Sequence, residues 1–202
     1  MSRQKKVGAV VRQRTRARVL AAAEEEFTEV GYVAATVARI AARAGVTVQS
    51  IYSSWGSKSA LFRAYLESAI APGTERVDFS GAISPGHPRE VVSQIAHLFR
   101  AVAERSGPAW RLYRDAAAVD PEIAADWQQL QMLRRGTFDI LLQSVSDRDL
   151  RVARPVAVDS AWAIASPDMY ELLVERATYT LDAFEKWVGE TIAAAVLRVV
   201  QE

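Results

Sequence analysis

Two short helical segments joined by a glycine turn constrain the fold of this chain more than any other feature. Residues 37–44 have helical spacing of apolar side chains, Gly45 breaks the pattern, and a second short helix is expected after Thr47. Glycine accepts a positive φ angle, so the chain can reverse sharply at this point. Helices this short are not stable alone, so the second must be held by Ile51 packing on Ile40 and on the first helix. The pattern predicts a compact helix-turn-helix.

The side chains that the second short helix leaves outward are small or hydrogen-bonding. They are Thr47, Val48, Gln49, Ser50, Tyr52 and Ser53. Such a surface suits insertion into a DNA major groove, where Gln pairs with adenine and the methyl groups of Thr or Val meet thymine. Lys58, at the start of the next helix, is placed to hold a phosphate. The alternative is an ordinary helical hairpin with a glycine turn.

Charge is distributed unevenly along the 202 residues, although the formal net charge is only +1. Residues 1–63 contain eleven Lys and Arg against four Glu, a net charge of +7, and the remainder carries −6. A basic head on an acidic body indicates a polyanionic partner at one end. The alternative is a solvated basic tail, and charge alone does not decide between the two.

Several classes of protein are excluded by composition and motif. The chain has no Cys, which rules out disulfide scaffolds, Cys-ligated metals and thiol catalysis. It has no apolar run long enough to cross a membrane and no secretory signal, so a cytoplasmic protein is expected. His87 and His97 have no companion carboxylate at i+4 spacing, so no metal site is expected. No phosphate-binding glycine loop or nucleophile motif occurs, so neither an enzyme nor a cofactor is expected.

Helical spacing recurs almost everywhere and strand signals are missing, which predicts an all-α fold. The first helix is expected from about Arg12 to Gly31, and its predicted buried stripe is Ala17, Leu20, Ala21, Phe27 and Val30. Thr36, Thr47 and Ser57 are expected to cap the next three helices. Further helices are expected at about 57–71, 89–105, 108–118, 121–146, 156–175 with a break at Ser166-Pro167, and 181–200, and the Pro- and Gly-rich residues 72–88 are expected to form a loop.

The N-terminal third resembles the DNA-binding domain of the tetracycline-repressor (TetR) family of transcription regulators. The resemblance covers about residues 12–66 and rests on Gly31-Tyr32, Thr36-Val37, Ile40-Ala41, Ala44-Gly45-Val46, Ile51-Tyr52, Trp55, Ser57-Lys58 and Leu61-Phe62. Two positions depart from the family pattern. Trp55 stands where Phe is usual, and Ser59 replaces a frequent acidic residue.

The resemblance implies a three-helix helix-turn-helix domain over residues 1–66 and a helical effector-binding and dimerisation domain over 67–202. It implies base-edge contacts from Thr47, Val48, Gln49 and Ser53, and phosphate contacts from Thr36, Ser50, Tyr52 and Lys58. The basic segment before the first helix adds Arg12, Arg14 and Arg16, which we expect to reach flanking phosphates or the adjacent minor groove.

In the second domain the resemblance implies a dimer formed by the last two helices. Its expected interface residues are Trp162, Tyr170, Phe184, Trp187, Val188 and Ile192. The last four of these belong to a broad apolar face of the last helix that one chain's core need not cover. The alternative is a helix packed entirely into its own subunit.

A small-molecule pocket, if present, is expected inside the helices between residues 89 and 175. Its candidate lining residues are Trp110, Tyr113, Arg114, Trp127, Gln131, Met132 and Trp162. The alternative for the aromatic residues is ordinary core packing, and the alternative for Arg114 is an ion pair with a nearby carboxylate.

The leading hypothesis is a homodimeric regulator, most simply a repressor, that binds a palindromic DNA operator and is released by a small hydrophobic or amphipathic effector. Effector binding would shift the helix over residues 57–71 and change the separation of the two recognition helices. Two other hypotheses remain. One is a DNA-binding regulator without an effector, and the other is an all-α small-molecule carrier.

Overall fold

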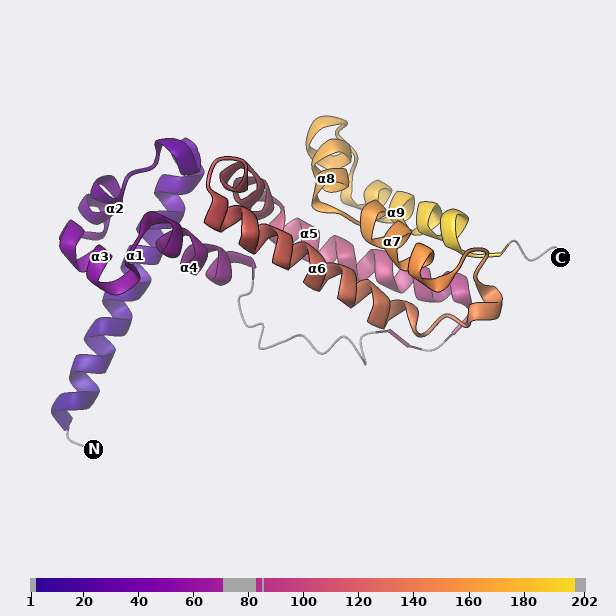
Figure 1. Cartoon of the computed structure of the whole chain (residues 1–202), viewed down its shortest axis with the longest axis horizontal. Helices are drawn as coiled ribbons and strands as arrows, with labels where there is room; N and C mark the ends of the chain where they lie inside the picture. The colour runs from indigo at the N-terminus through magenta and orange to yellow at the C-terminus, as the bar shows by residue number, and fades with distance from the viewer. Residues whose placement is uncertain (1–2, 71–82, 85, 199–202) are drawn as a thin grey trace. The chain divides into compact units, whose positions relative to one another are not determined.

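The computed structural model describes residues 3–70, 83–84 and 86–198, without the side chains of residues 3–9 and 70. Most of the predicted loop over residues 72–88 therefore lies outside the described residues. The regular elements of the described chain are all helices, with one isolated backbone bridge besides, which confirms the predicted all-α fold (Figure 1). Its helices are α1 (Arg3–Ala34), α2 (Val37–Ala44), α3 (Val48–Trp55), α4 (Lys58–Ile70), α5 (Pro88–Ala117), α6 (Pro121–Leu142), α7 (Arg154–Ile164), α8 (Pro167–Tyr170) and α9 (Leu181–Val196).

Two compact units make up the chain, and they do not follow its order. Unit 1 contains the described residues within 1–73 and 112–127, and unit 2 contains those within 74–111 and 128–202. The tip of the α5–α6 hairpin therefore belongs to the same unit as α1–α4. The functional division at residues 66 and 67 stays a prediction. Among the described residues, no helix is long and apolar enough to cross a membrane.

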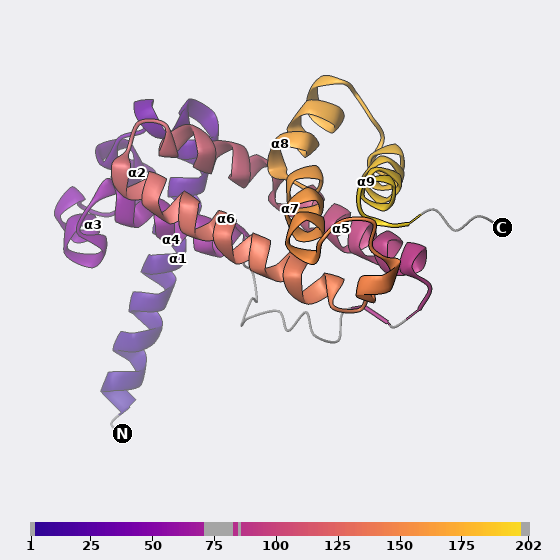
Figure 2. The ribbon, with the colours of Figure 1, turned by 45° about the vertical axis from the view of Figure 1, so that its right-hand side comes forward.

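α1 begins earlier than predicted, at Arg3, and its N-terminal turns extend beyond α2–α4 in both views (Figures 1 and 2). It bends at Gly31, where φ is 75° and ψ is 169°, and continues to Ala34. The predicted buried stripe is partly wrong. Ala17 and Ala21 are exposed and line a surface groove with α4.

The residues of α1 that are fully buried lie on a neighbouring stripe. They are Val19, Ala22, Ala23, Glu26 and Phe27. The prediction missed this register because one of the five is a glutamate, and an apolar pattern alone does not include a charged side chain.

The core of unit 1 is a cluster of aromatic rings from three segments that are distant in sequence. Phe27 and Tyr32 of α1 contact Phe62 of α4 at ring-centroid distances of 4.9 and 4.8 Å. Tyr65 joins from α4, and Tyr113 from the end of α5 packs edge-on to Phe62. The cluster anchors both α4 and the α5–α6 tip on α1.

α5 is one helix of 30 residues, although two helices divided before Pro108 were predicted. Proline in a helix interior removes a hydrogen bond, so the sequence pattern favoured a break. Packing overrides this preference, because Ala103 and Trp110 on either side of the proline are both buried in unit 2. Gly107 lies against the ring of Tyr170, so close that a Cβ there would lie 2.7 Å from Cε1.

Unit 2 is built around an aromatic and aliphatic core between α5, α7 and α9. Phe99 of α5 stacks on Trp110 and contacts Phe184 of α9, which also meets Tyr170 edge-on. α8 is followed by a wide-turned helical segment, Glu171–Arg176, before α9 begins behind its cap Thr180. α6 ends at Leu142 and α9 at Val196, each a turn earlier than predicted.

Candidate nucleic-acid interface

The turn between α2 and α3 has the geometry that the sequence predicts. Gly45 adopts the left-handed conformation (φ 63°, ψ 41°), its N–H donates to the carbonyl of Ala42, and the N–H of Val46 donates to the carbonyl of Ala41. These two bonds form a Schellman motif, which satisfies the last carbonyls of α2. A side chain at Gly45 would meet no neighbour, so only the positive φ requires glycine.

Hydroxyl caps define the start of each short helix, as predicted. Thr36 Oγ1 accepts from the N–H of Arg39 at 3.2 Å, and Thr47 Oγ1 accepts from the N–H of Ser50 at 3.1 Å. Ser57 Oγ accepts from the N–H of Ala60 at 3.0 Å. The hydroxyls of Thr47 and Ser50 also lie 2.8 Å apart, so the first turn of α3 is internally hydrogen-bonded.

α3 presents its polar side chains to solvent. Ile51 is buried with 1% of its surface exposed and faces the same core as Ile40, whereas Val48 and Tyr52 are 39% and 48% exposed. The other predicted DNA contacts on and beside this helix are also exposed, namely Thr36, Thr47, Gln49, Ser50 and Ser53. α3 contains no acidic residue. A nucleic acid could therefore approach this face without meeting a carboxylate of α3.

A buried carboxylate fixes α2 on α1, and sequence reasoning missed it. Glu26 has no exposed surface, and its two oxygens form ion pairs with Arg39 Nε at 3.0 Å and Arg43 Nε at 3.1 Å. Arg43 also pairs with Glu25 and Glu29 on the surface. Two arginines four residues apart on α2 were the available signal, because they lie on one face of the helix. Both cations are therefore engaged in holding α2 against α1.

The predicted basic arm is helical and its described arginines are exposed. Arg12 and Arg16 lie four residues apart on one face of α1, and Arg14 and Arg18 lie on another. The guanidinium of Arg16 lies 5.4 Å from the ring centroid of Trp55, at the end of α3. The face that carries Arg12 and Arg16 is therefore on the same side of α1 as the C-terminal end of α3.

Lys58 is half-buried at the first turn of α4. Its ammonium donates to the carbonyl of Val33 at 3.3 Å and lies 4.5 Å from the ring centroid of Tyr32. Burial lowers the pKa of Lys58, and the negative charge of Asp120 partly offsets this effect. One of its three N–H groups is used in the described structure.

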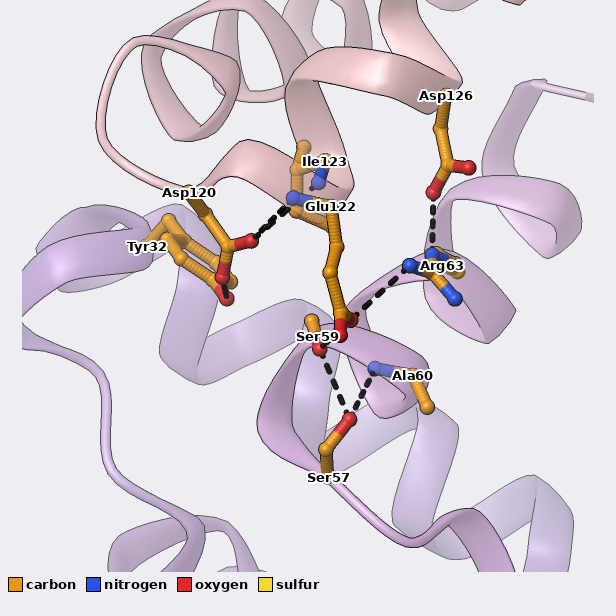
Figure 3. Close-up of polar contacts among 9 residues, drawn as sticks. All are labelled: Tyr32, Ser57, Ser59, Ala60, Arg63, Asp120, Glu122, Ile123 and Asp126. Carbon is orange, nitrogen blue, oxygen red and sulfur yellow. Dashed lines mark hydrogen bonds and ion pairs between the residues drawn. The ribbon is translucent and has the colours of Figure 1, made fainter.

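Three carboxylates at the start of α6 contact side chains of α1 and α4 (Figure 3). Tyr32 Oη donates to Asp120 Oδ2 at 2.5 Å, and Ser59 Oγ donates to Glu122 Oε2 at 2.9 Å. The guanidinium of Arg63 pairs with Glu122 at 3.1 Å and with Asp126. Every one of these residues belongs to unit 1.

The predicted ligand-binding residues are divided between the two units. Tyr113, Arg114 and Trp127 lie in unit 1, and Trp110, Gln131, Met132 and Trp162 lie in unit 2. Trp110 and Tyr113 are buried in aromatic clusters, whereas Met132 is 56% exposed. An open groove of about 470 Å³ lies between α5 and α9, and its lining includes none of these seven residues but six charged ones: Arg89, Arg100, Asp182, Glu185, Lys186 and Glu190.

Arg134 of unit 2 is a polar residue that the prediction omitted. Its guanidinium lies 5.7 Å from the ring centroid of Trp110 and donates to Gln131 Oε1 at 2.5 Å and to the carbonyl of Ala165 at 2.7 Å. Desolvation by burial lowers the pKa of Arg134 to about 10. Among the described residues of the same unit, two donors are buried without a hydrogen-bond partner, Ser106 Oγ and Trp162 Nε1.

The predicted dimer residues fall into two groups. Phe184, Val188 and Ile192 have no exposed surface, and Tyr170 is also buried, so in the single chain these four offer little or nothing to a second copy. Their apolar periodicity reflects packing into their own subunit. Trp162 and Trp187 are half-exposed. On the outer side of α9, Trp187 is accompanied by Ala183, Thr191 and Ala194.

A fixed glycine turn, an exposed second helix without carboxylates and a cationic helix beside it define a helix-turn-helix DNA-binding protein. Comparison with known proteins agrees. Residues 19–65 match the bacterial regulatory proteins of the tetR family. Over 158 residues, 77% of each chain, the sequence is 27% identical to YdeS of Bacillus subtilis (strain 168), an uncharacterized HTH-type transcriptional regulator. Residues 19–65 therefore form a helix-turn-helix domain of the tetR family of bacterial regulatory proteins.

Solved structures share the fold of more than nine-tenths of the chain. NalD, the secondary repressor of the MexAB-OprM multidrug efflux pump in Pseudomonas aeruginosa, superposes with a TM-score of 0.69 at 18% identity, covering 92% of this chain and 97% of NalD. SmeT in its complex with triclosan gives a TM-score of 0.69 at 22% identity, covering 91% of this chain and 92% of SmeT. At these identities the similarity shows the fold alone.

Proposed function

We propose that the protein is a homodimeric repressor that binds a palindromic operator and is released by a small hydrophobic or amphipathic effector. The observation that carries the proposal is α3, whose exposed face bears hydrogen-bonding and methyl groups and no carboxylate. The helix is short, so it reads few base pairs, and a two-fold dimer doubles the contact.

Roles on the DNA-binding face follow from exposure and from the hydrogen bonds already made. Val48, Gln49 and Ser53 are the proposed base-edge contacts, with Gln49 directed to adenine. Thr47 uses its hydroxyl as the cap of α3, so its proposed base contact is through the methyl group. Thr36, Ser50, Tyr52 and Lys58 are the proposed phosphate contacts, and Arg12, Arg14 and Arg16 extend them along the flanking duplex.

The proposed dimer face is the outer side of α7 and α9, which pack on each other in unit 2. On α9 it consists of Ala183, Trp187, Thr191 and Ala194, and on α7 the 51%-exposed Val156 and the half-exposed Trp162 contribute. Small side chains around one large aromatic allow two helices to approach closely, and the residues of this set carry no charge. These features support association of two copies.

An effector site inside unit 2 is supported by polar groups that the protein leaves unsatisfied. Ser106 Oγ and the indole N–H of Trp162 are buried donors without partners, and such groups are costly unless something accepts their hydrogen bonds. SmeT, which has the same fold, is known in complex with triclosan, an amphipathic aromatic compound. The proposed effector is an aromatic molecule with at least one hydrogen-bond acceptor. Its binding would change the separation of the two α3 helices.

DNA binding is tested by selecting duplexes from a random pool with the purified protein and measuring affinity by fluorescence anisotropy. A two-fold symmetric consensus is expected, and Gln49→Ala should relax the preference at one base position per half-site by about 1–3 kcal/mol. An asymmetric consensus, or no selection at all, would contradict the proposal.

Dimerisation is tested by Trp187→Glu, which places a charge in the proposed face. The variant should elute as a monomer and lose operator affinity, whereas Lys186→Ala, the adjacent exposed residue, should do neither.

Effector binding is tested with triclosan as the probe. Quenching of tryptophan fluorescence and release of the duplex are expected, and both should weaken in Trp162→Phe. Quenching without release of DNA would favour a carrier, and neither effect with any aromatic probe would favour a regulator without an effector.

A further inference from the structure

Lys58 is held by two groups that follow directly from the bend in α1. After Gly31 the chain turns so that the ring of Tyr32 and the carbonyl of Val33 both face α4. The ammonium lies 4.5 Å from the ring centroid and 3.3 Å from the carbonyl oxygen. The ammonium of lysine is carried on a flexible chain of four carbons. Contacts of this kind are therefore needed to hold it in one place at a DNA surface.

The Tyr32 ring is itself fixed on several sides. It is 93% buried, it contacts Phe27 and Phe62, and its hydroxyl donates to Asp120 Oδ2 at 2.5 Å. The other carboxylate oxygen, Asp120 Oδ1, accepts from the N–H of Glu122 at 3.0 Å and caps α6 (Figure 3). Asp120 therefore connects the first turn of α6 to the ring beneath Lys58.

We propose that Tyr32 is a positioning residue for operator binding: its ring holds the Lys58 ammonium at the DNA surface, and Asp120 at the start of α6 fixes that ring. The inference rests on the proposed function, because it assigns Lys58 a phosphate. Within unit 1, it adds a connection between α1 and the start of α6 to the contacts that α4 makes with Glu122 and Asp126. A displacement of the first turn of α6 would break the Tyr32–Asp120 bond and release Lys58 from its place.

A double-variant cycle between Tyr32 and Lys58 tests the proposal on the full-length protein, with a fluorescein-labelled duplex selected by the wild type. Lys58→Met should weaken binding and reduce the slope of log affinity against log salt by about 0.9, the value of one phosphate contact. Tyr32→Leu should weaken binding about 3- to 10-fold and reduce the slope similarly. In the Lys58→Met background, Tyr32→Leu should cost less than twofold.

Conservative variants keep the test decisive if Tyr32→Leu does not fold. Tyr32→Phe keeps the ring, and Asp120→Asn keeps a capping oxygen. Each should weaken DNA binding about 2- to 5-fold, and the double variant should be no weaker than either alone. Tyr65→Phe is the matched control, because this tyrosine belongs to the same aromatic cluster, where it contacts Phe27 and Phe62, whereas Lys58 lies over Tyr32. It should bind DNA like the wild type.

Two results would overturn the inference. One is an equal loss from Tyr32→Leu with and without Lys58, and the other is an unchanged salt slope; either outcome would make Tyr32 a core residue only. Failure of the proposed function looks different, because Gln49→Ala and Lys58→Met would then both leave affinity for the duplex unchanged.

Discussion

The helix-turn-helix and the helices of unit 2 are organised by different kinds of interaction. Between residues 36 and 60, the helices begin at hydroxyl caps within their own turn, and α2 ends at a left-handed glycine. In unit 2, the course of the chain depends on contacts between distant segments, such as Gly107 against Tyr170 and Phe99 against Phe184. Local interactions leave the outer face of α3 exposed to a partner. Long-range packing buries most of the apolar surface of α9.

Glu26 sharpens this comparison, because its ion pairs hold the locally capped α2 on α1. Replacing it with Gln should destabilise the protein by about 1.5–3 kcal/mol, since a buried side chain loses two charge-assisted contacts to arginines that are themselves partly exposed. Glu25→Gln is the matched control, an adjacent exposed glutamate that also pairs with Arg43, and it should cost at most about 1 kcal/mol. Urea unfolding measures both. Equal effects would show that α2 is held mainly by apolar contacts.

Two glycines test the difference between local and long-range control directly. Gly107→Ala should cost about 1–3 kcal/mol, because the new methyl group would overlap the Tyr170 ring. Gly45→Ala should cost about 1–2 kcal/mol from backbone strain alone, because nothing surrounds its side-chain position. Gly136→Ala, on an open face of α6, should stabilise by about 0.5–1 kcal/mol. Thermal unfolding of the three variants provides the measurement, and a stabilising Gly107→Ala would refute the packing argument.

How far the sequence predicts the structure depends on the same distinction. Thr36, Thr47, Ser57 and Gly45 act within one helical turn, so their roles could be predicted from neighbouring residues. The course of α5 through Pro108 could not, because it depends on residues such as Tyr170, more than sixty positions away.

The dimer face and the polar residues of unit 2 were harder to predict for a related reason. The spacing of Phe184, Val188 and Ile192 shows that one face of α9 is apolar, but it does not show whether the same chain or a second copy covers it. The structure assigns these three to the chain's own core. Arg134 was missed because no local pattern places an arginine over a distant tryptophan.

The two arginine-bearing faces of α1 allow defined phosphate contacts to be distinguished from attraction by net charge. Arg12 and Arg16 lie on the side nearer α3, where Arg16 meets Trp55, and Arg14 and Arg18 lie on another side. Replacing Arg12 and Arg16 with Gln should reduce the salt slope of DNA binding by up to about 1.8. The same replacement of Arg14 and Arg18 removes equal charge but should reduce the slope by only up to about 0.9, because Arg14 alone of this pair is a proposed phosphate contact. Equal slopes would indicate attraction by net charge without defined phosphate contacts.

The smallest expected effect concerns pH and the contact between α6 and α1. The hydrogen bond from Tyr32 lowers the pKa of Asp120, which means that folding favours its ionised form. A carboxylate with a lowered pKa contributes stability that is present above the unfolded pKa of about 3.9 and is lost as pH falls through the folded value. The difference in unfolding free energy between the wild type and Asp120→Asn should therefore shrink as the pH is lowered from 5 to 3. Asp120 is only partly buried, so solvent screening keeps the effect below about 1 kcal/mol.

Asp139→Asn, an exposed carboxylate on α6, measures the background of removing one surface charge. A difference that stays constant with pH would show that Tyr32 and Asp120 are not coupled in the folded protein, and α6 would then be attached to the head through Glu122 and Asp126 alone.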